Sequence, residues 1–133
     1  MKAKELGAIK ALQLLVSAPF HCSMMRPAGK SLDEELKKIN FNNPLIPYIS
    51  NVNAEVVSSN EDISKLLVQQ VSHSVLWYQS VELMLQRGVR KFIEVGPGAV
   101  LTKLVNSIAE RSNINVKCVS LETVESLDDI KLM

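Results

Sequence analysis

The stretch KFIEVGPGAVLTKLV, residues 91–105, combines an apolar run, a turn with two glycines and the beginning of a helical pattern. Residues 91–95 predict a strand, and the apolar residues that follow recur at the spacing of one helix face. Those helix residues are Val100, Leu101, Leu104, Val105 and Ile108. Residues 116–121 predict a second strand. Because strands that alternate with helices form βαβ units, the sequence predicts an α/β fold with a partial, mainly parallel sheet flanked by helices.

The turn itself, EVGPG at residues 94–98, has two interpretations. Its glycines could bring backbone N–H groups close to an anion at the start of the next helix. It lacks the Lys-Ser/Thr of a phosphate-binding loop and the third glycine of a dinucleotide fingerprint. The sequence therefore favours a tight structural turn.

Upstream of this unit, the pattern predicts three further helices. The first has its apolar stripe at Met25, Ala28, Leu32, Leu36 and Ile39, with Pro27 near its start. On its outer face we expect the ion pairs Asp33–Lys37 and Glu34–Lys38. The second carries Ile63, Leu66, Leu67 and Val71, with Asn60 as N-cap, and the third runs from a Ser74 cap to Gly88 and turns Trp77, Val81, Met84 and Leu85 inward.

Four shorter segments complete the expected organisation. Residues 2–10 predict a short helix, residues 12–16 a strand buried on both faces, and residues 126–133 a frayed helical end. Residues 45–50 look like a strand, but Pro47 removes a ladder donor, so an edge strand or an irregular extended segment is expected.

The composition limits the classes of protein. The chain has 133 residues, 47% of them apolar, which suits one domain with a core of its own. A net charge of +1 without charge runs gives no reason to expect binding to nucleic acid or to a membrane surface. Cys22 and Cys118 lack metal-ligand spacing and read as free thiols in a reducing compartment. No signal peptide or membrane span is apparent, so we expect a soluble product without a metal site.

His21 is the first candidate for chemistry. It lies in SAPFHCSMM, residues 17–25, after the expected buried strand, and thus at the carboxyl end of the sheet, where open α/β folds hold ligands. A loop imidazole can also merely cap or pack, so position alone leaves both interpretations open. Cys22 points away from its neighbour in extended chain and reads as a small buried side chain rather than a nucleophile. His73 is expected at a surface or helix end.

Two other polar features stand out. Gln70 interrupts the apolar face of its helix, so it either closes the helix end or faces a cleft. Arg87, Arg90 and Lys91 form a small basic cluster that could contact an acidic partner, although such clusters are usually solvated ends of elements.

Four blocks resemble the C-terminal portion of the malonyl-CoA:acyl carrier protein transacylase family in order and spacing. They are VSAPFHCSMMRPA (16–28), NPLIPYISNVNAEVV (43–57), LVQQVSHSVLWYQSVELMLQRGV (67–89) and FIEVGPGAVLTKLV (92–105). The resemblance implies transfer of a malonyl group from coenzyme A to the thiol of acyl carrier protein through a serine ester, with no resident cofactor. It also implies a cytoplasmic enzyme of fatty-acid biosynthesis.

The resemblance assigns roles to three residues. His21 matches the catalytic histidine, which serves as base first for the serine and then for the incoming thiol. Gln70 matches the position whose main-chain carbonyl orients the other ring nitrogen. Phe20 matches the position before that histidine, where bulk would crowd an α-methyl group and so favour malonyl units.

The sequence also departs from the family. No Gly-x-Ser-x-Gly elbow occurs among its five glycines, so the serine nucleophile is missing, as is the arginine that grips the malonate carboxylate. We expect residues 1–133 to be the C-terminal part of an acyltransferase domain, without the nucleophile-bearing N-terminal part or the small ferredoxin-like subdomain. A sheet without those strands would expose apolar surface, so we expect self-association or docking with an N-terminal fragment.

Two alternatives stay open beside this prediction. One is a non-catalytic remnant that binds acyl carrier protein through the basic stretch at residues 87–91. The other is a decayed product without function.

Overall fold

The computed structural model describes residues 2–11, 18–124 and 127. The expected strand at residues 12–16 and most of the expected helical end at residues 126–133 lie outside this part. The N-terminal helix, α1, is short and covers Lys2–Glu5.

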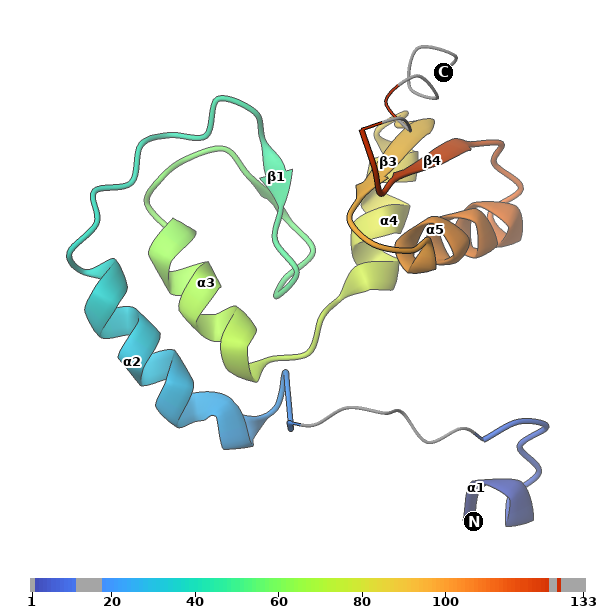
Figure 1. Cartoon of the computed structure of the whole chain (residues 1–133), viewed down its shortest axis with the longest axis horizontal. Coiled ribbons are helices and arrows are strands. Elements are labelled where there is room, and N and C mark those ends of the chain that lie inside the picture. Colours follow the sequence, from blue (N-terminus) through green and yellow to red (C-terminus); the bar gives the residue numbers. More distant parts are fainter. Residues whose placement is uncertain (1, 12–17, 125–126, 128–133) are drawn as a thin grey trace.

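The remaining elements form two groups (Figure 1). The first consists of a 3₁₀ turn at Ser23–Met25, the helices α2 (Arg26–Leu36) and α3 (Ile63–Ser72), and the antiparallel strands β1 (Tyr48–Ile49) and β2 (Val56–Val57). The second consists of α4 (Trp77–Gln86), β3 (Lys91–Val95), α5 (Val100–Arg111) and β4 (Lys117–Leu121). Residues 73–76 connect the groups.

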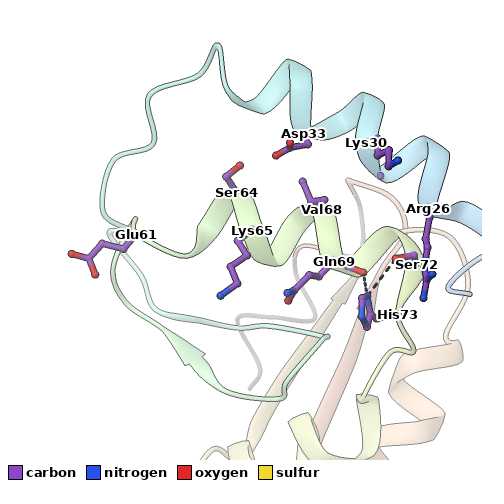
Figure 2. A pocket seen from close by; sticks show the side chains of 11 residues that line it. Arg26, Lys30, Asp33, Glu61, Ser64, Lys65, Val68, Gln69, Ser72 and His73 are labelled. Carbon is purple, nitrogen blue, oxygen red and sulfur yellow. Dashed lines mark hydrogen bonds between the residues drawn. The ribbon is translucent and has the colours of Figure 1, made fainter. Parts of the chain in front are cut away.

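Helices α2 and α3 pack against each other, as Figure 2 shows from close by. Gly29 is buried at this contact, with the backbone of Val68 next to it. Leu36 and Leu66 are buried as well, whereas Ala28 and Ile39 of the expected stripe are exposed. The stripe prediction is therefore wrong at Ala28 and Ile39, because α2 stops at Leu36 and turns its glycine, not its alanine, toward α3.

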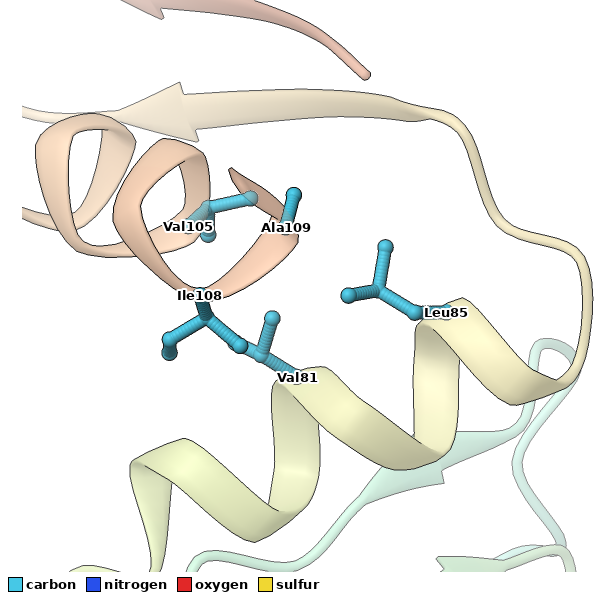
Figure 3. Close-up of a cluster of buried hydrophobic side chains, with 5 residues drawn as sticks. All are labelled: Val81, Leu85, Val105, Ile108 and Ala109. Atoms are coloured by element: carbon cyan, nitrogen blue, oxygen red, sulfur yellow. The ribbon is translucent and has the colours of Figure 1, made fainter. Parts of the chain in front are cut away.

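The second group contains a five-residue core between α4 and α5 (Figure 3). Its members are Val81, Leu85, Val105, Ile108 and Ala109. Val81 is completely buried, and Phe92 of β3 and Cys118 of β4 pack against the cluster from the sheet. The inward-facing residues expected for α4 are thus confirmed, and Gly88 ends that helix with φ +86°, as expected.

The α/β fold and its parallel pairing are confirmed by the strand pair β3–β4, in which Phe92 lies opposite Cys118. Successive strand residues face opposite sides of a sheet. Phe92 faces the helices, so Ile93 and Val95 face the other way, and they are 45% and 80% exposed. Within the described residues, the β3 side of this sheet face therefore exposes apolar side chains, as expected for a partial sheet.

Three local predictions are wrong. Asn60 does not cap α3, whose N-cap is Asp62, because the Asn60 amide donates to the carbonyl of Phe41 at 2.7 Å. Ser74 does not cap α4, which begins two residues after Val75 with Leu76 at the N-cap. Lys38 pairs with Glu35 at 2.7 Å rather than with Glu34, whereas the Asp33–Lys37 pair is present at 2.9 Å. Pro27 lies at the start of α2, as expected.

Candidate active site

His21 lies in the loop before α2 and has a left-handed backbone, with φ +56°. Few residues other than glycine adopt this conformation, although histidine does so more often than most. Holding it costs roughly 1–3 kcal/mol, so the surroundings must fix it. The side chain is exposed, and a hydrogen bond holds its ring.

That bond joins His21 Nδ1 to the main-chain carbonyl oxygen of Gln70 at 2.9 Å. Gln70 lies in the last turn of α3, and the last carbonyls of a helix have no partner within the helix. A carbonyl oxygen only accepts, so Nδ1 carries the hydrogen in this contact. Nε2 is then the unprotonated nitrogen of the neutral ring and can accept a proton from another group.

A pocket of about 370 Å³ adjoins this ring. It is lined by Phe20, His21, Met25, Leu32, Leu67, Gln70 and Val71. The structure thus brings together the three residues singled out from the sequence, Phe20, His21 and Gln70. Apart from His21 and Gln70 the lining is apolar, and Phe20 is 59% exposed at its rim. Such a pocket can hold a small organic group next to His21.

A larger groove of about 600 Å³ runs between α2 and α3 and does not include His21 (Figure 2). His73 lines it, and its Nδ1 donates to the carbonyl oxygen of Gln69 at 2.6 Å. The expected helix-end position of His73 is confirmed. This imidazole closes the end of α3 rather than facing the pocket of His21.

The two cysteines do not form a reactive pair with a histidine. The half-buried Cys22 thiol donates to the carbonyl oxygen of Pro19 at 3.1 Å. Cys118 is in β4, and burial raises the pKa of its thiol, which disfavours the reactive thiolate. Among the described residues, no group of three or more histidine, cysteine or acidic side chains could hold a metal ion.

The EVGPG turn is a structural element. Gly96 and Gly98 have φ angles of +143° and +82°, and the Glu94 carboxylate accepts N–H groups of α5 from Thr102 at 2.7 Å and Leu101 at 3.0 Å. The bond from Thr102, followed by that from Leu101, holds the pKa of Glu94 below its usual range. An internal carboxylate thus occupies the place where an anion would bind. The sequence interpretation missed this cap, although the spacing from Glu94 to the helix start was visible.

The basic cluster is less available than the sequence suggested. The Arg90 guanidinium donates to the carbonyl oxygens of Leu85 and Val89, each at 2.8 Å, and so closes the end of α4. Arg87 and Lys91 are exposed.

None of the helices in the described part of the chain combines the length and apolar character that a membrane-spanning segment needs.

A parallel strand pair backed by helices defines a partial α/β fold, and in it a loop histidine oriented by a main-chain carbonyl lies beside a small apolar pocket. Comparison with known proteins specifies the family. The Escherichia coli (strain K12) malonyl CoA-acyl carrier protein transacylase is 44% identical over 107 residues, which is 80% of this chain and 35% of that protein. No protein-family model matches.

Solved structures agree with this similarity. A malonyl CoA-acyl carrier protein transacylase from Clostridium perfringens superimposes with a TM-score of 0.87 at 39% identity, over 98% of this chain and 40% of that one. A malonyl-transacylase in complex with its type II PKS acyl-carrier protein matches with a TM-score of 0.85 at 34% identity, over 98% and 41%.

The chain is therefore homologous to the malonyl CoA-acyl carrier protein transacylases, and the match is consistent with their C-terminal portion. It spans 35% of the length of the E. coli relative and 40% of the solved C. perfringens chain.

Proposed function

We propose that this chain carries the catalytic histidine of a malonyl-CoA:acyl carrier protein S-malonyltransferase. The observation that carries the proposal is the 2.9 Å contact between His21 Nδ1 and the Gln70 carbonyl oxygen. It leaves Nε2 as a proton acceptor, which is what an alcohol nucleophile requires. In this proposal Gln70 takes the orienting role that a carboxylate has in a catalytic triad.

The reaction has two balanced halves. In the first, Nε2 of His21 accepts the proton of a serine hydroxyl while the serine oxygen attacks the thioester carbonyl of malonyl-CoA. The C–S bond breaks, and the coenzyme A thiolate takes the proton from the imidazolium. In the second half, Nε2 accepts the proton of the phosphopantetheine thiol, whose sulfur attacks the serine ester, and the departing serine oxygen recovers the proton.

The serine must come from a polypeptide segment outside these 133 residues, on the same or on another chain, because no Gly-x-Ser-x-Gly elbow occurs here. We propose the same source for the arginine that binds the malonate carboxylate. The uncovered apolar face around Ile93 and Val95 supports such a segment, since exposed apolar sheet faces usually receive a partner.

Phe20 is the proposed determinant of acyl-group choice. It lines the pocket next to His21, where an α-methyl group on the substrate would meet its ring. A single methyl group is discriminated by about 1–3 kcal/mol, so the pocket favours malonyl over methylmalonyl units without excluding the latter.

The partners in this proposal are a coenzyme A thioester and acyl carrier protein, with no resident cofactor, and the setting is cytoplasmic fatty-acid synthesis. The complex of the homologous malonyl-transacylase with its acyl-carrier protein supports the second partner.

A reconstitution experiment tests the proposal. The chain is mixed with a purified serine-bearing N-terminal segment of a relative and with radiolabelled malonyl-CoA, and acylated serine and malonylated carrier protein are measured. We expect acylation with the wild-type chain and with His73→Ala, and a loss of about 10²- to 10⁴-fold with His21→Ala. Equal rates for His21→Ala and wild type would refute the role of His21. Binding of carrier protein without any acylation would favour the non-catalytic alternative instead.

A further inference from the structure

Asn51 lies in the turn between β1 and β2, and its side chain leaves that turn. The turn is closed by other groups. The Ser50 N–H donates to the Glu55 carbonyl at 3.0 Å, the Ala54 N–H donates to the Ser50 carbonyl at 2.9 Å, and Asn53 bonds with Glu55. The carboxamide of Asn51 is therefore not needed to form the turn.

Two polar groups of Asn51, the side-chain amide and the main-chain carbonyl, reach the end of α3 and the connection to α4. Its Nδ2 donates to Oε1 of Gln70 at 3.4 Å, and its main-chain carbonyl accepts the N–H of Leu76 at 2.8 Å. Gln70 and Leu76 lie on either side of the end of α3. The half-buried Asn51 thus ties both sides of the helix end to the β1–β2 turn.

This helix end has to be held because it carries the acceptor for His21. Hydrogen bonds weaken steeply when they are bent, and last turns of helices fray. A rotation of the Gln70 peptide would release Nδ1 of His21, which lies 49 residues away in sequence. The left-handed backbone of His21 would then have one fewer contact to fix its ring.

We propose that Asn51 is a positioning residue for His21. By holding the side chain of Gln70 it keeps the Gln70 carbonyl directed at Nδ1, and so maintains the ring as the Nδ1–H tautomer with Nε2 unprotonated. The inference rests on the proposed role of His21 as base, but its test does not depend on activity.

The test uses the full chain with ¹⁵N-labelled histidine and reads the Nδ1 and Nε2 chemical shifts of His21 at alkaline pH, where the ring is neutral. These shifts give the ratio of the two tautomers. Asn51→Leu removes the carboxamide at similar volume, and Gln70→Met removes its partner while keeping the main-chain carbonyl. Asn106→Leu, the same substitution at an exposed position of α5, is the matched control.

We expect the ratio of Nδ1–H to Nε2–H tautomer to fall roughly 2- to 10-fold in Asn51→Leu, the range of one net hydrogen bond, and to stay unchanged in Asn106→Leu. Gln70→Met should give the same fall, and the double variant no additional one. An unchanged ratio in a folded Asn51→Leu protein would overturn the inference. If that variant does not fold, an unchanged ratio in Gln70→Met decides against it. Failure of the reconstituted acylation would refute the proposed function and leave this result standing.

Discussion

Replacement of Gly29 by alanine should stabilise the chain and tighten the packing of α2 against α3, the two helices next to His21. Gly29 lies inside α2 at its contact with α3. A Cβ atom placed there would lie 3.5 Å from the carbonyl oxygen of Val68, 3.9 Å from its Cγ1 and 3.9 Å from Cβ of Val71. These are ordinary contact distances, so the methyl group fits without displacing either helix.

The expected gain follows from two contributions. Glycine in a helix interior is about 0.8–1.0 kcal/mol less favourable than alanine. Burying one methyl group adds about 0.8 kcal/mol. Since the site is close to the start of α2, we expect the free energy of unfolding to rise by about 1–2 kcal/mol.

Urea unfolding followed by far-ultraviolet circular dichroism measures this change. Gly88→Ala is the matched control: it has open space around it but φ +86°, so the same substitution there should lower the free energy of unfolding by about 1–2 kcal/mol. A loss of stability in Gly29→Ala would show that α2 and α3 are packed more closely than described. Gly29→Val, which adds two further carbons to the same contact, should destabilise by about 1–3 kcal/mol.

Three further predictions concern the core, the helix cap and the pocket. Val81→Ala should lower the free energy of unfolding in urea by about 2–3 kcal/mol, because it removes two carbons from a fully buried site and leaves a cavity. Glu94→Gln should lower the thermal midpoint at neutral pH. Since the folded-state pKa of Glu94 lies below its ordinary value of 4.5, the wild-type advantage is present above pH 4.5 and lost as the pH falls through the folded pKa; a difference that persists in acid would contradict this account. In the reconstituted enzyme, Phe20→Ala should reduce the preference for malonyl-CoA over methylmalonyl-CoA in kcat/KM by roughly 10- to 200-fold, and an unchanged preference would remove Phe20 from substrate selection.

The sequence predicted the second half of the fold well because its signals are local. Residues 91–95 form β3 as expected, and the expected strand at 116–121 is β4 within one residue. Hydrophobic periodicity and the glycine at the end of α4 suffice for such elements. N-caps were predicted poorly, because a side chain that could cap a helix can instead bind a group far away in the sequence. The Asn60 amide, for example, donates to the carbonyl of Phe41, 19 residues earlier.

The candidate site, in contrast, depends on contacts between residues that are far apart in the sequence. His21 and Gln70 were singled out from the resemblance, and no local pattern indicates that a ring and a carbonyl 49 residues apart meet at 2.9 Å. The contact requires α2 and α3 to pack against each other and requires α3 to end where it does. Asn51 was missed for the same reason, since its turn is made by its neighbours and its own side chain serves another element.

These relations make the end of α3 the point on which the orientation of two histidine rings depends. Two successive main-chain carbonyls there accept hydrogen bonds from two different histidine rings. The Gln69 carbonyl accepts from His73, and the Gln70 carbonyl accepts from His21. His73 directly follows α3 and closes the end of that helix, whereas His21 approaches from the loop before α2. A substitution that unwinds the last turn should therefore affect both rings, while one that separates α2 from α3 should release His21 alone. Histidine ¹⁵N shifts distinguish these cases, because the His73 tautomer stays unchanged in the second and changes in the first.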